Sequence, residues 1–137
     1  MILQIINRNK NIKIGNVKTF RDYTFVDDLC NAYWKLYQLE KGYGELYNVG
    51  SGKTVQIKKI FQILSKMSEF KSHLKTEKRR FRPSKSEVIK LHSSNIKFKK
   101  NLNWTPKYNL EKGLFKTLSW FNLNKKIFKN IINKYSI

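Results

Sequence analysis

The sequence predicts a mixed α/β fold with a few short strands and about four helices. Apolar residues recur at helical spacing over residues 57–67 and 110–121, which is the pattern of amphipathic helices. Stretches such as Asn11–Gly15 alternate apolar and polar residues, which is typical of strands. The apolar run Glu45–Gly50 ends in a glycine turn before a helical pattern, and this order is half of a parallel βαβ unit.

Three elements are predicted in the first part of the chain. Ile2–Ile6 has the spacing of the end of a helix, and Asn11–Gly15 forms a short strand. A helix follows over Asp28–Lys41, with Asp27 or Asp28 as a suitable cap and glycines at its end. Its apolar stripe consists of Leu29, Ala32, Tyr33, Leu36 and Leu39.

The middle of the chain predicts strands on both sides of a second helix. Glu45–Gly50 suits a buried strand at the edge of a larger parallel sheet, and Thr54 can cap the helix that follows. The apolar stripe of this helix consists of Ile57, Ile60, Phe61, Leu64 and Met67. Short strands are expected at His73–Lys78 and Val88–Leu91.

The last third of the chain predicts two more helices. Ser93 or Ser94 can cap a short one, and Asn109 can cap a longer one. The longer helix places its apolar residues on one inner face, made of Leu110, Leu114, Leu118 and Phe121. Trp104 and Trp120 are expected to anchor the core rather than to stack on a ligand.

Composition indicates one globular domain at most. The 137 residues carry 29 Lys and Arg against 9 Asp and Glu, a net charge of +20, yet 40% are hydrophobic, which argues against disorder. Only five of the basic residues are arginines, and the lysines are scattered along the chain. This distribution favours a solvated lysine surface that steers anionic substrates over a groove for nucleic acid.

The single cysteine and the N-terminal residues favour a soluble, cytoplasmic protein with no membrane partner. One cysteine excludes an internal disulfide and fits a reducing compartment. Cys30 falls in the first turns of a predicted helix, where we expect a small buried side chain rather than a nucleophile. The apolar run at the start covers only six residues, which is too short to span a bilayer.

Two stretches place an arginine beside a turn signal at the end of an apolar run. They are Gly15–Asp28, with the sequence GNVKTFRDYTFVDD, and Arg80–Val88, with the sequence RFRPSKSEV. Such a setting packs the stem of the arginine and presents its guanidinium to a phosphate. The pair therefore predicts an anionic ligand held between two separated arginines.

These stretches also carry a family resemblance. GN, RDYTFVDD, ELYNVGSG, RFRPSKSEV and NWTPKYNLEKGLFKTLSWF follow one another from about residue 15 to 121. In this order they resemble the C-terminal half of extended short-chain dehydrogenases, the NAD-dependent epimerase/dehydratase family acting on nucleotide sugars. GN before RD, and RPSKSEV, are more similar to the 4,6-dehydratases, of the GDP-mannose and UDP-N-acetylglucosamine types, than to the 4-epimerases.

The resemblance implies three substrate-binding residues. Arg21 and Arg82 match the arginines that contact the nucleotide diphosphate, and Glu87 matches a carboxylate near the ribose. The residue types suit this task, because two arginines balance two phosphates and a carboxylate accepts from two hydroxyls. The alternative is that Arg21 pairs with Asp22 or Asp27 at the surface and that Arg82 is one more exposed cation.

The resemblance also implies what this chain lacks. It has no glycine-rich dinucleotide turn and no Tyr-x-x-x-Lys placed as in the family. We therefore expect no catalytic and no cofactor-binding residues, although NAD or NADP serves the full-length family. His73 and His92 stand apart from other ligand residues, so no metal site is expected.

Three interpretations remain at this point. In the first, residues 1–122 form the nucleotide-sugar-binding region of a dehydratase or epimerase, with 123–137 as a basic tail. The dinucleotide-binding N-terminal half is missing, so an upstream partner or a homodimer is implied. In the second, the chain is a small basic nucleic-acid-binding protein whose aromatics alternate with lysines. In the third, it is a remnant with exposed apolar faces.

Overall fold

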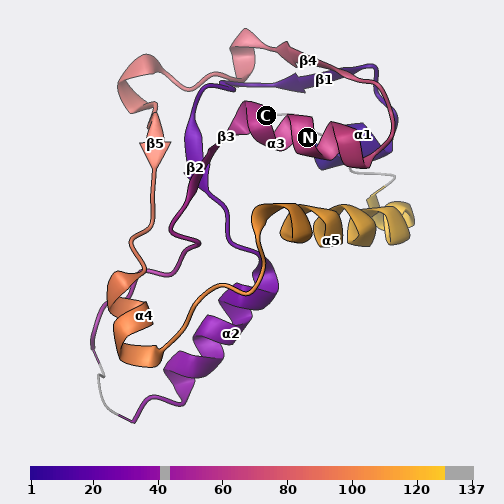
Figure 1. Ribbon diagram of the computed structural model, residues 1–137. Coiled ribbons are helices and arrows are strands. Elements are labelled where there is room, and N and C mark those ends of the chain that lie inside the picture. The colour runs from indigo at the N-terminus through magenta and orange to yellow at the C-terminus, as the bar shows by residue number, and fades with distance from the viewer. Residues whose placement is uncertain (41–43, 129–137) are drawn as a thin grey trace.

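The computed structural model describes residues 1–40 and 44–128 and shows a mixed α/β arrangement (Figure 1). Within these residues there are five α-helices, one more than expected: α1 (Ile2–Ile6), α2 (Val26–Tyr37), α3 (Ile57–Met67), α4 (Ile96–Leu102) and α5 (Leu110–Leu123). The five strands are β1 (Asn11–Ile14), β2 (Phe20–Asp22), β3 (Thr54–Gln56), β4 (His73–Thr76) and β5 (Lys90–Leu91). Three 3₁₀ turns are η1 (Lys78–Arg80), η2 (Ser84–Ser86) and η3 (Lys125–Phe128).

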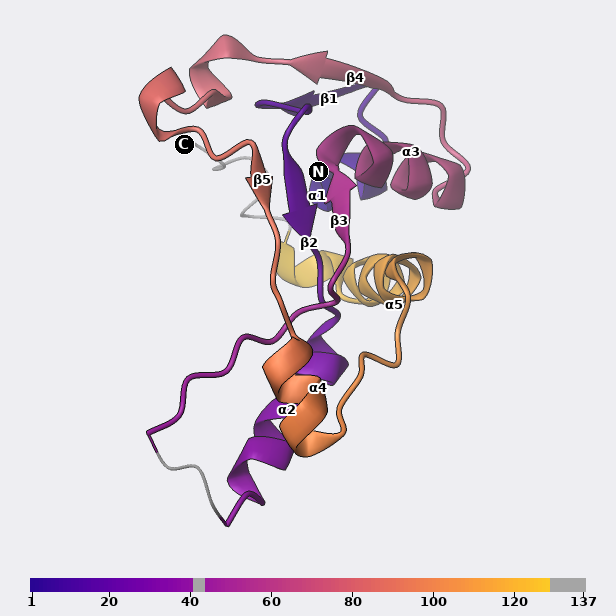
Figure 2. The same cartoon turned by 60° about the vertical axis from the view of Figure 1, so that its left-hand side comes forward.

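The strands form two small sheets. β1 pairs in parallel with β4, with Ile12 opposite Leu74. β2 is the centre of the other sheet, antiparallel to β3 and parallel to β5, and Figure 2 shows the three side by side. Arg21 therefore lies opposite Val55 on one side and Leu91 on the other.

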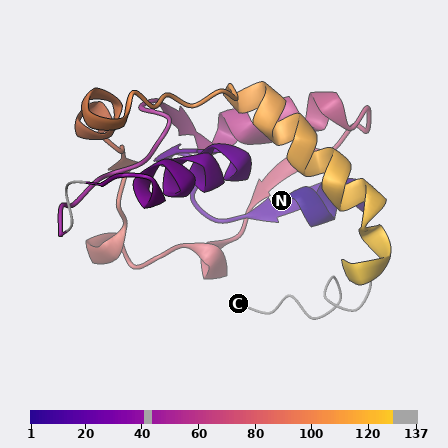
Figure 3. The same ribbon diagram turned by 90° about the horizontal axis from the view of Figure 1, so that it is seen from below.

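The larger core lies where α1, α3 and α5 meet below β1. Figure 3 shows α5 running across this face of the molecule. The predicted apolar stripes of α3 and α5 are confirmed, because their residues are buried or partly buried in this core. The core consists of Ile5, Ile6, Ile12, Ile60, Leu64 and Leu118, with Phe61, Met67, Leu110, Leu114 and Phe121 packed against it. Asn109 is confirmed as the cap of α5, since its Oδ1 accepts from the Lys112 amide at 2.9 Å.

A smaller aromatic core lies between α2 and α4. Phe98 is fully buried, and its ring meets those of Trp104 and Tyr47 edge-on, with centroids 5.2 and 5.6 Å away. Trp104 is thus a core anchor, as expected. Trp120 is not, because it is 51% exposed at the end of α5.

Asp28 does not cap a helix, and neither does Asp27. The helix α2 begins at Val26 after Phe25, with no side-chain cap. Asp28 lies in its first turn, 2% exposed, and accepts the amides of Lys107 at 2.9 Å and Tyr108 at 3.1 Å. These long-range donors fix the start of α2 to the segment that leads into α5.

Two further residues of α2 are more exposed than predicted. Cys30 is exposed, and Tyr33 is 62% exposed although it belongs to the predicted stripe. The helix ends at Tyr37, and the predicted end at Lys41 lies outside the described residues. Ala32 alone of that stripe is fully buried, so α2 is covered on a narrower face than its sequence suggests.

The predicted strand over Glu45–Gly50 is wrong for this structure, as are two predicted caps. Glu45–Val49 runs without strand pairing and joins neither the β3-β2-β5 sheet nor the β1-β4 sheet. Thr54 lies in β3, and Gln56 precedes α3. Asn95, and not a serine, precedes α4, and its side-chain Nδ2 donates to the Gly50 carbonyl at 2.9 Å.

We expect Asp28→Ala to lower the free energy of unfolding by about 2–4 kcal/mol, because it leaves two amides in a buried site without an acceptor. Urea unfolding followed by circular dichroism measures this change. The matched control is Asp27→Ala, which removes an exposed carboxylate 3.7 Å from Lys116 and should cost less than about 1 kcal/mol. Equal losses in the two variants would contradict the role of Asp28.

Candidate functional site

Arg21 is held in place on the central strand β2. Its side chain is 22% exposed, and Nη1 donates to the carbonyl of Phe20 at 2.7 Å. Nη2 lies 3.6 Å from Oε1 of Glu87, whose side chain is 12% exposed. The structure thus brings together two of the three predicted site residues from distant parts of the sequence.

Arg82 lies earlier on the segment that carries Glu87, between η1 and η2, and it is exposed. In the described part of the chain no hydrogen bond or ion pair joins it to Arg21 or Glu87. Arg82 is therefore an exposed cation that is separate from the contact between Arg21 and Glu87. The structure brings Arg21 and Glu87 into contact but does not bring Arg82 to them.

The surface pairing that served as the alternative for Arg21 is wrong. Asp22 accepts from the amide of Ser51 at 2.9 Å and the amide of Gly52 at 2.9 Å. Asp27 faces Lys116. Both carboxylates are thus engaged elsewhere, and the partner of Arg21 is Glu87.

A second acidic residue, Glu77, holds two more of the arginines. Glu77 lies 3.1 Å from Arg79 and 2.5 Å from Arg80. The hydrogen bond from Arg80 lowers the pKa of Glu77 from its ordinary 4.5, more than desolvation raises it. Gly15 makes this arrangement possible, because a Cβ there would lie 2.3 Å from the Arg80 carbonyl oxygen.

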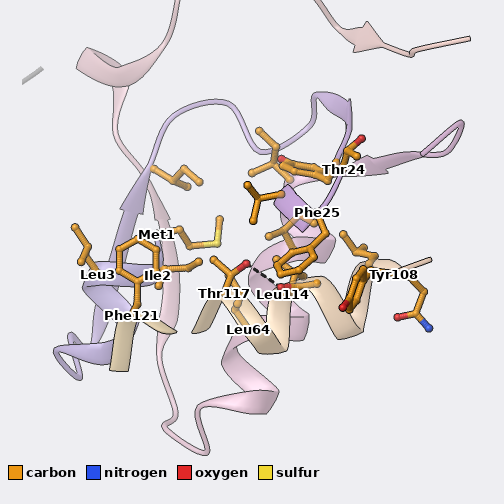
Figure 4. Close-up of a pocket in the computed structure, with 18 residues that line it drawn as sticks. Met1, Ile2, Leu3, Thr24, Phe25, Leu64, Tyr108, Leu114, Thr117 and Phe121 are labelled. Carbon is orange, nitrogen blue, oxygen red and sulfur yellow. Dashed lines mark hydrogen bonds between the residues drawn. The ribbon is translucent and has the colours of Figure 1, made fainter. Parts of the chain in front are cut away.

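A cavity of about 670 Å³ lies close to Arg21 (Figure 4). Tyr23, two residues after Arg21, is one of the residues that line it. Burial raises the pKa of Tyr23, and the charge of Arg21 opposes that rise. The walls are mostly apolar side chains such as Leu64, Leu114 and Phe121, and among the residues that the structure describes no lysine or arginine lines them. The hydroxyl of Thr117 donates to the Gly113 carbonyl at 2.8 Å, so the cavity offers mainly apolar contacts.

Asn16 is a site residue that the sequence analysis missed. Its Nδ2 donates to Oε2 of Glu87 at 3.4 Å, so Glu87 contacts Arg21 through one oxygen and Asn16 through the other. The GN motif was the available signal, since it precedes RD at a short distance. Nothing local in the sequence predicts that its partner is Glu87.

The described ranges lack a metal-ion cluster and a helix that could span a membrane, and two of the aromatic residues that alternate with lysines are buried. Residues 1–40 and 44–128 contain no cluster of three or more His, Cys, Asp and Glu that could hold a metal ion. No helix within the same ranges has the length and apolarity needed to cross a bilayer. Phe98 and Trp104, which interleave with lysines in the sequence, are 0% and 1% exposed, so neither is available to stack on a base.

Comparison with known proteins matches residues 1–117 to the family model described as GDP-mannose 4,6 dehydratase. A UDP-glucuronate 4-epimerase from Thermodesulfobacterium geofontis is 33% identical over 136 residues, covering 92% of this chain and 38% of the relative. A CDP-abequose synthase from Salmonella muenchen is 27% identical over 121 residues, covering 86% and 40%. The chain thus spans about two fifths of the length of these curated relatives.

Comparison with solved structures agrees with these sequence matches. An epimerase from Methanothermobacter thermautotrophicus superimposes with a TM-score of 0.82 at 24% identity, covering 98% of this chain and 38% of that one. A UDP-glucose 4-epimerase from Thermotoga maritima, solved with UDP-glucose, gives 0.75 at 27% identity, covering 92% and 38%. The fold is therefore that of part of an extended short-chain dehydrogenase. The chain belongs to the NAD-dependent epimerase/dehydratase family.

We expect Glu77→Gln to destabilise the protein at neutral pH and to have no effect in acid. A depressed folded pKa contributes stability that is present above the unfolded value of about 4.5 and is lost as the pH falls through the folded value. Thermal unfolding of wild type and variant between pH 7 and pH 3 measures the difference. Glu69→Gln is the control, since no described residue forms an ion pair with Glu69; a difference that stays constant with pH would refute this role of Glu77.

Proposed function

We propose that this chain is the nucleotide-sugar-binding, C-terminal region of an NAD-dependent 4,6-dehydratase or epimerase. The observation that carries the proposal is the contact between Arg21 and Glu87. A guanidinium that is mostly buried and aligned by a carboxylate and a carbonyl is suited to bind an anion from one fixed direction. A solvated surface cation has no such support.

The roles of the three residues follow from their chemistry. Arg21 binds one phosphate of the nucleotide diphosphate, and the exposed Arg82 closes on the other from its loop. Glu87, which already accepts from Asn16, has lone pairs left for the ribose hydroxyls. The scarcity of acidic residues, nine in the chain, leaves little competition for this cationic pair.

Chemical turnover is assigned to another part of the protein. The family reaction oxidises the hexose at C4 with NAD or NADP; a dehydratase then eliminates water across C5 and C6. The residues of this chain do not fit a dinucleotide, because no strand in its sequence is followed by a GxxGxxG or GxGxxG turn into a helix. Residues 1–122 therefore bind substrate, and 123–137 form a basic tail, of which 129–137 lie outside the described residues.

The exposed aromatic face of α2 supports the presence of a partner. Trp34 and Tyr37 stack on each other with centroids 5.5 Å apart and are 58% and 80% exposed. Tyr33 on the same helix is 62% exposed, and Leu46 in the segment after it is 80% exposed. Apolar exposure on this scale is typical of an interface, and we assign it to the dinucleotide-binding part of the enzyme, in the same or a second polypeptide.

We expect the double variant Arg21→Ala and Arg82→Ala to bind UDP-glucose and GDP-mannose at least about 100-fold more weakly than wild type. Each arginine supplies a charge-assisted hydrogen bond worth about 1.5–3 kcal/mol. Isothermal titration calorimetry at fixed ionic strength measures the affinities.

The control removes the same number of positive charges, two, from α3, where Lys58 and Lys59 are exposed. Lys58→Ala with Lys59→Ala should change the affinity by less than about threefold. Single-stranded oligonucleotides are tested in parallel. Equal losses in the two double variants, or tighter binding of oligonucleotide than of nucleotide sugar, would favour a lysine-coated nucleic-acid binder instead.

A further inference from the structure

Asn16 is fixed at both ends of its side chain. Its Oδ1 accepts from the amide of Lys18 at 2.9 Å, and its Nδ2 donates to Oε2 of Glu87 at 3.4 Å. The backbone carbonyl of Asn16 accepts from the hydroxyl of Thr19 at 3.3 Å. Because the Lys18 amide can only donate, the amide oxygen must face it, and the NH₂ group must face Glu87.

Glu87 depends on this donor for its orientation. One carboxylate oxygen faces Arg21 at 3.6 Å and the other faces Asn16. With its side chain 12% exposed, little water reaches Glu87 to replace a lost partner. Without Asn16 the carboxylate would be free to turn, and Arg21 would lose its fixed counter-charge.

The backbone keeps the two segments at this distance. Gly15 precedes Asn16 and lets the chain approach the carbonyl of Arg80 so closely that no larger residue fits. The segment that carries Glu87 is thereby held beside the connection between β1 and β2. The contact between Asn16 and Glu87 is therefore built into the fold.

We propose that Asn16 is a positioning residue of the diphosphate site, which orients Glu87 and through it aligns the guanidinium of Arg21. This rests on the proposed function. The 3.6 Å separation is too long for a hydrogen bond, so Glu87 aligns Arg21 electrostatically and leaves the donors of Nη2 for a phosphate. Asn16 thus acts on the ligand without touching it.

The test exchanges the two polar groups. Asn16→Asp places a second carboxylate beside Glu87, and the repulsion between them should weaken the binding of inorganic pyrophosphate roughly tenfold. Adding Glu87→Gln removes the repulsion and restores one amide and one carboxylate, although the negative charge then lies at position 16 instead of beside Arg21, so the exchanged pair should recover part of the lost affinity. Asn16→Ala is made as well, in case Asn16→Asp does not fold by circular dichroism.

A second readout needs no ligand. The Nε–H signal of Arg21 in ¹⁵N NMR spectra reports the order of the guanidinium in the free protein. It should broaden or shift in the Asn16→Asp and Asn16→Ala variants and move part of the way back toward its wild-type position in the exchanged pair. A merely structural role for Asn16 would lower thermal stability without this recovery.

The outcomes separate the two proposals. If Asn16→Asp binds pyrophosphate as wild type does, or if the exchanged pair is as weak as Asn16→Asp, the positioning role is overturned. If wild type fails to bind pyrophosphate, or binds it equally well after Arg21→Ala, the proposed function fails. In that case the Arg21 signal still decides whether Asn16 acts through Glu87.

Discussion

The pairing of β2 on both of its edges is the constraint on which this structure depends. Three residues of β2 pair with β3 on one side, and two of them also pair with β5 on the other. The β5 contact draws in the segment that carries Glu87, and the β3 contact draws in the start of α3. The guanidinium of Arg21 is consequently fixed from the strand, by the Phe20 carbonyl, and from outside it, by Glu87.

Charge is distributed unevenly over this framework. Lysines dominate the net charge of +20, and two of the nine acidic residues hold three of the arginines: Glu77 faces Arg79 and Arg80, and Glu87 faces Arg21. Paired guanidiniums keep a direction, whereas solvated ammonium groups attract any anion. The organised arginines therefore indicate a specific anionic ligand more strongly than the net charge does.

Sequence patterns predicted the elements that local periodicity determines and missed those that depend on distant partners. The stripes of α3 and α5 and the Asn109 cap are local, and they are confirmed. Asp28 was assigned a local cap, but two amides far along the chain take its carboxylate. Glu45–Gly50 has a strand sequence without a strand partner. Arg21 and Glu87 were each named from motifs, but their contact arises from strand pairing, which no local pattern encodes.

The most direct test of the central claim is to locate the binding site of a nucleotide diphosphate on the 137-residue chain. Backbone amide signals would be followed by ¹H–¹⁵N NMR during titration with GDP and with UDP. Our account predicts shifts confined to β2, the residues from Asn16 to the start of β2, and the segment from η1 to β5. Shifts spread over the lysines of α4 and α5, or no shifts with either nucleotide, would contradict it.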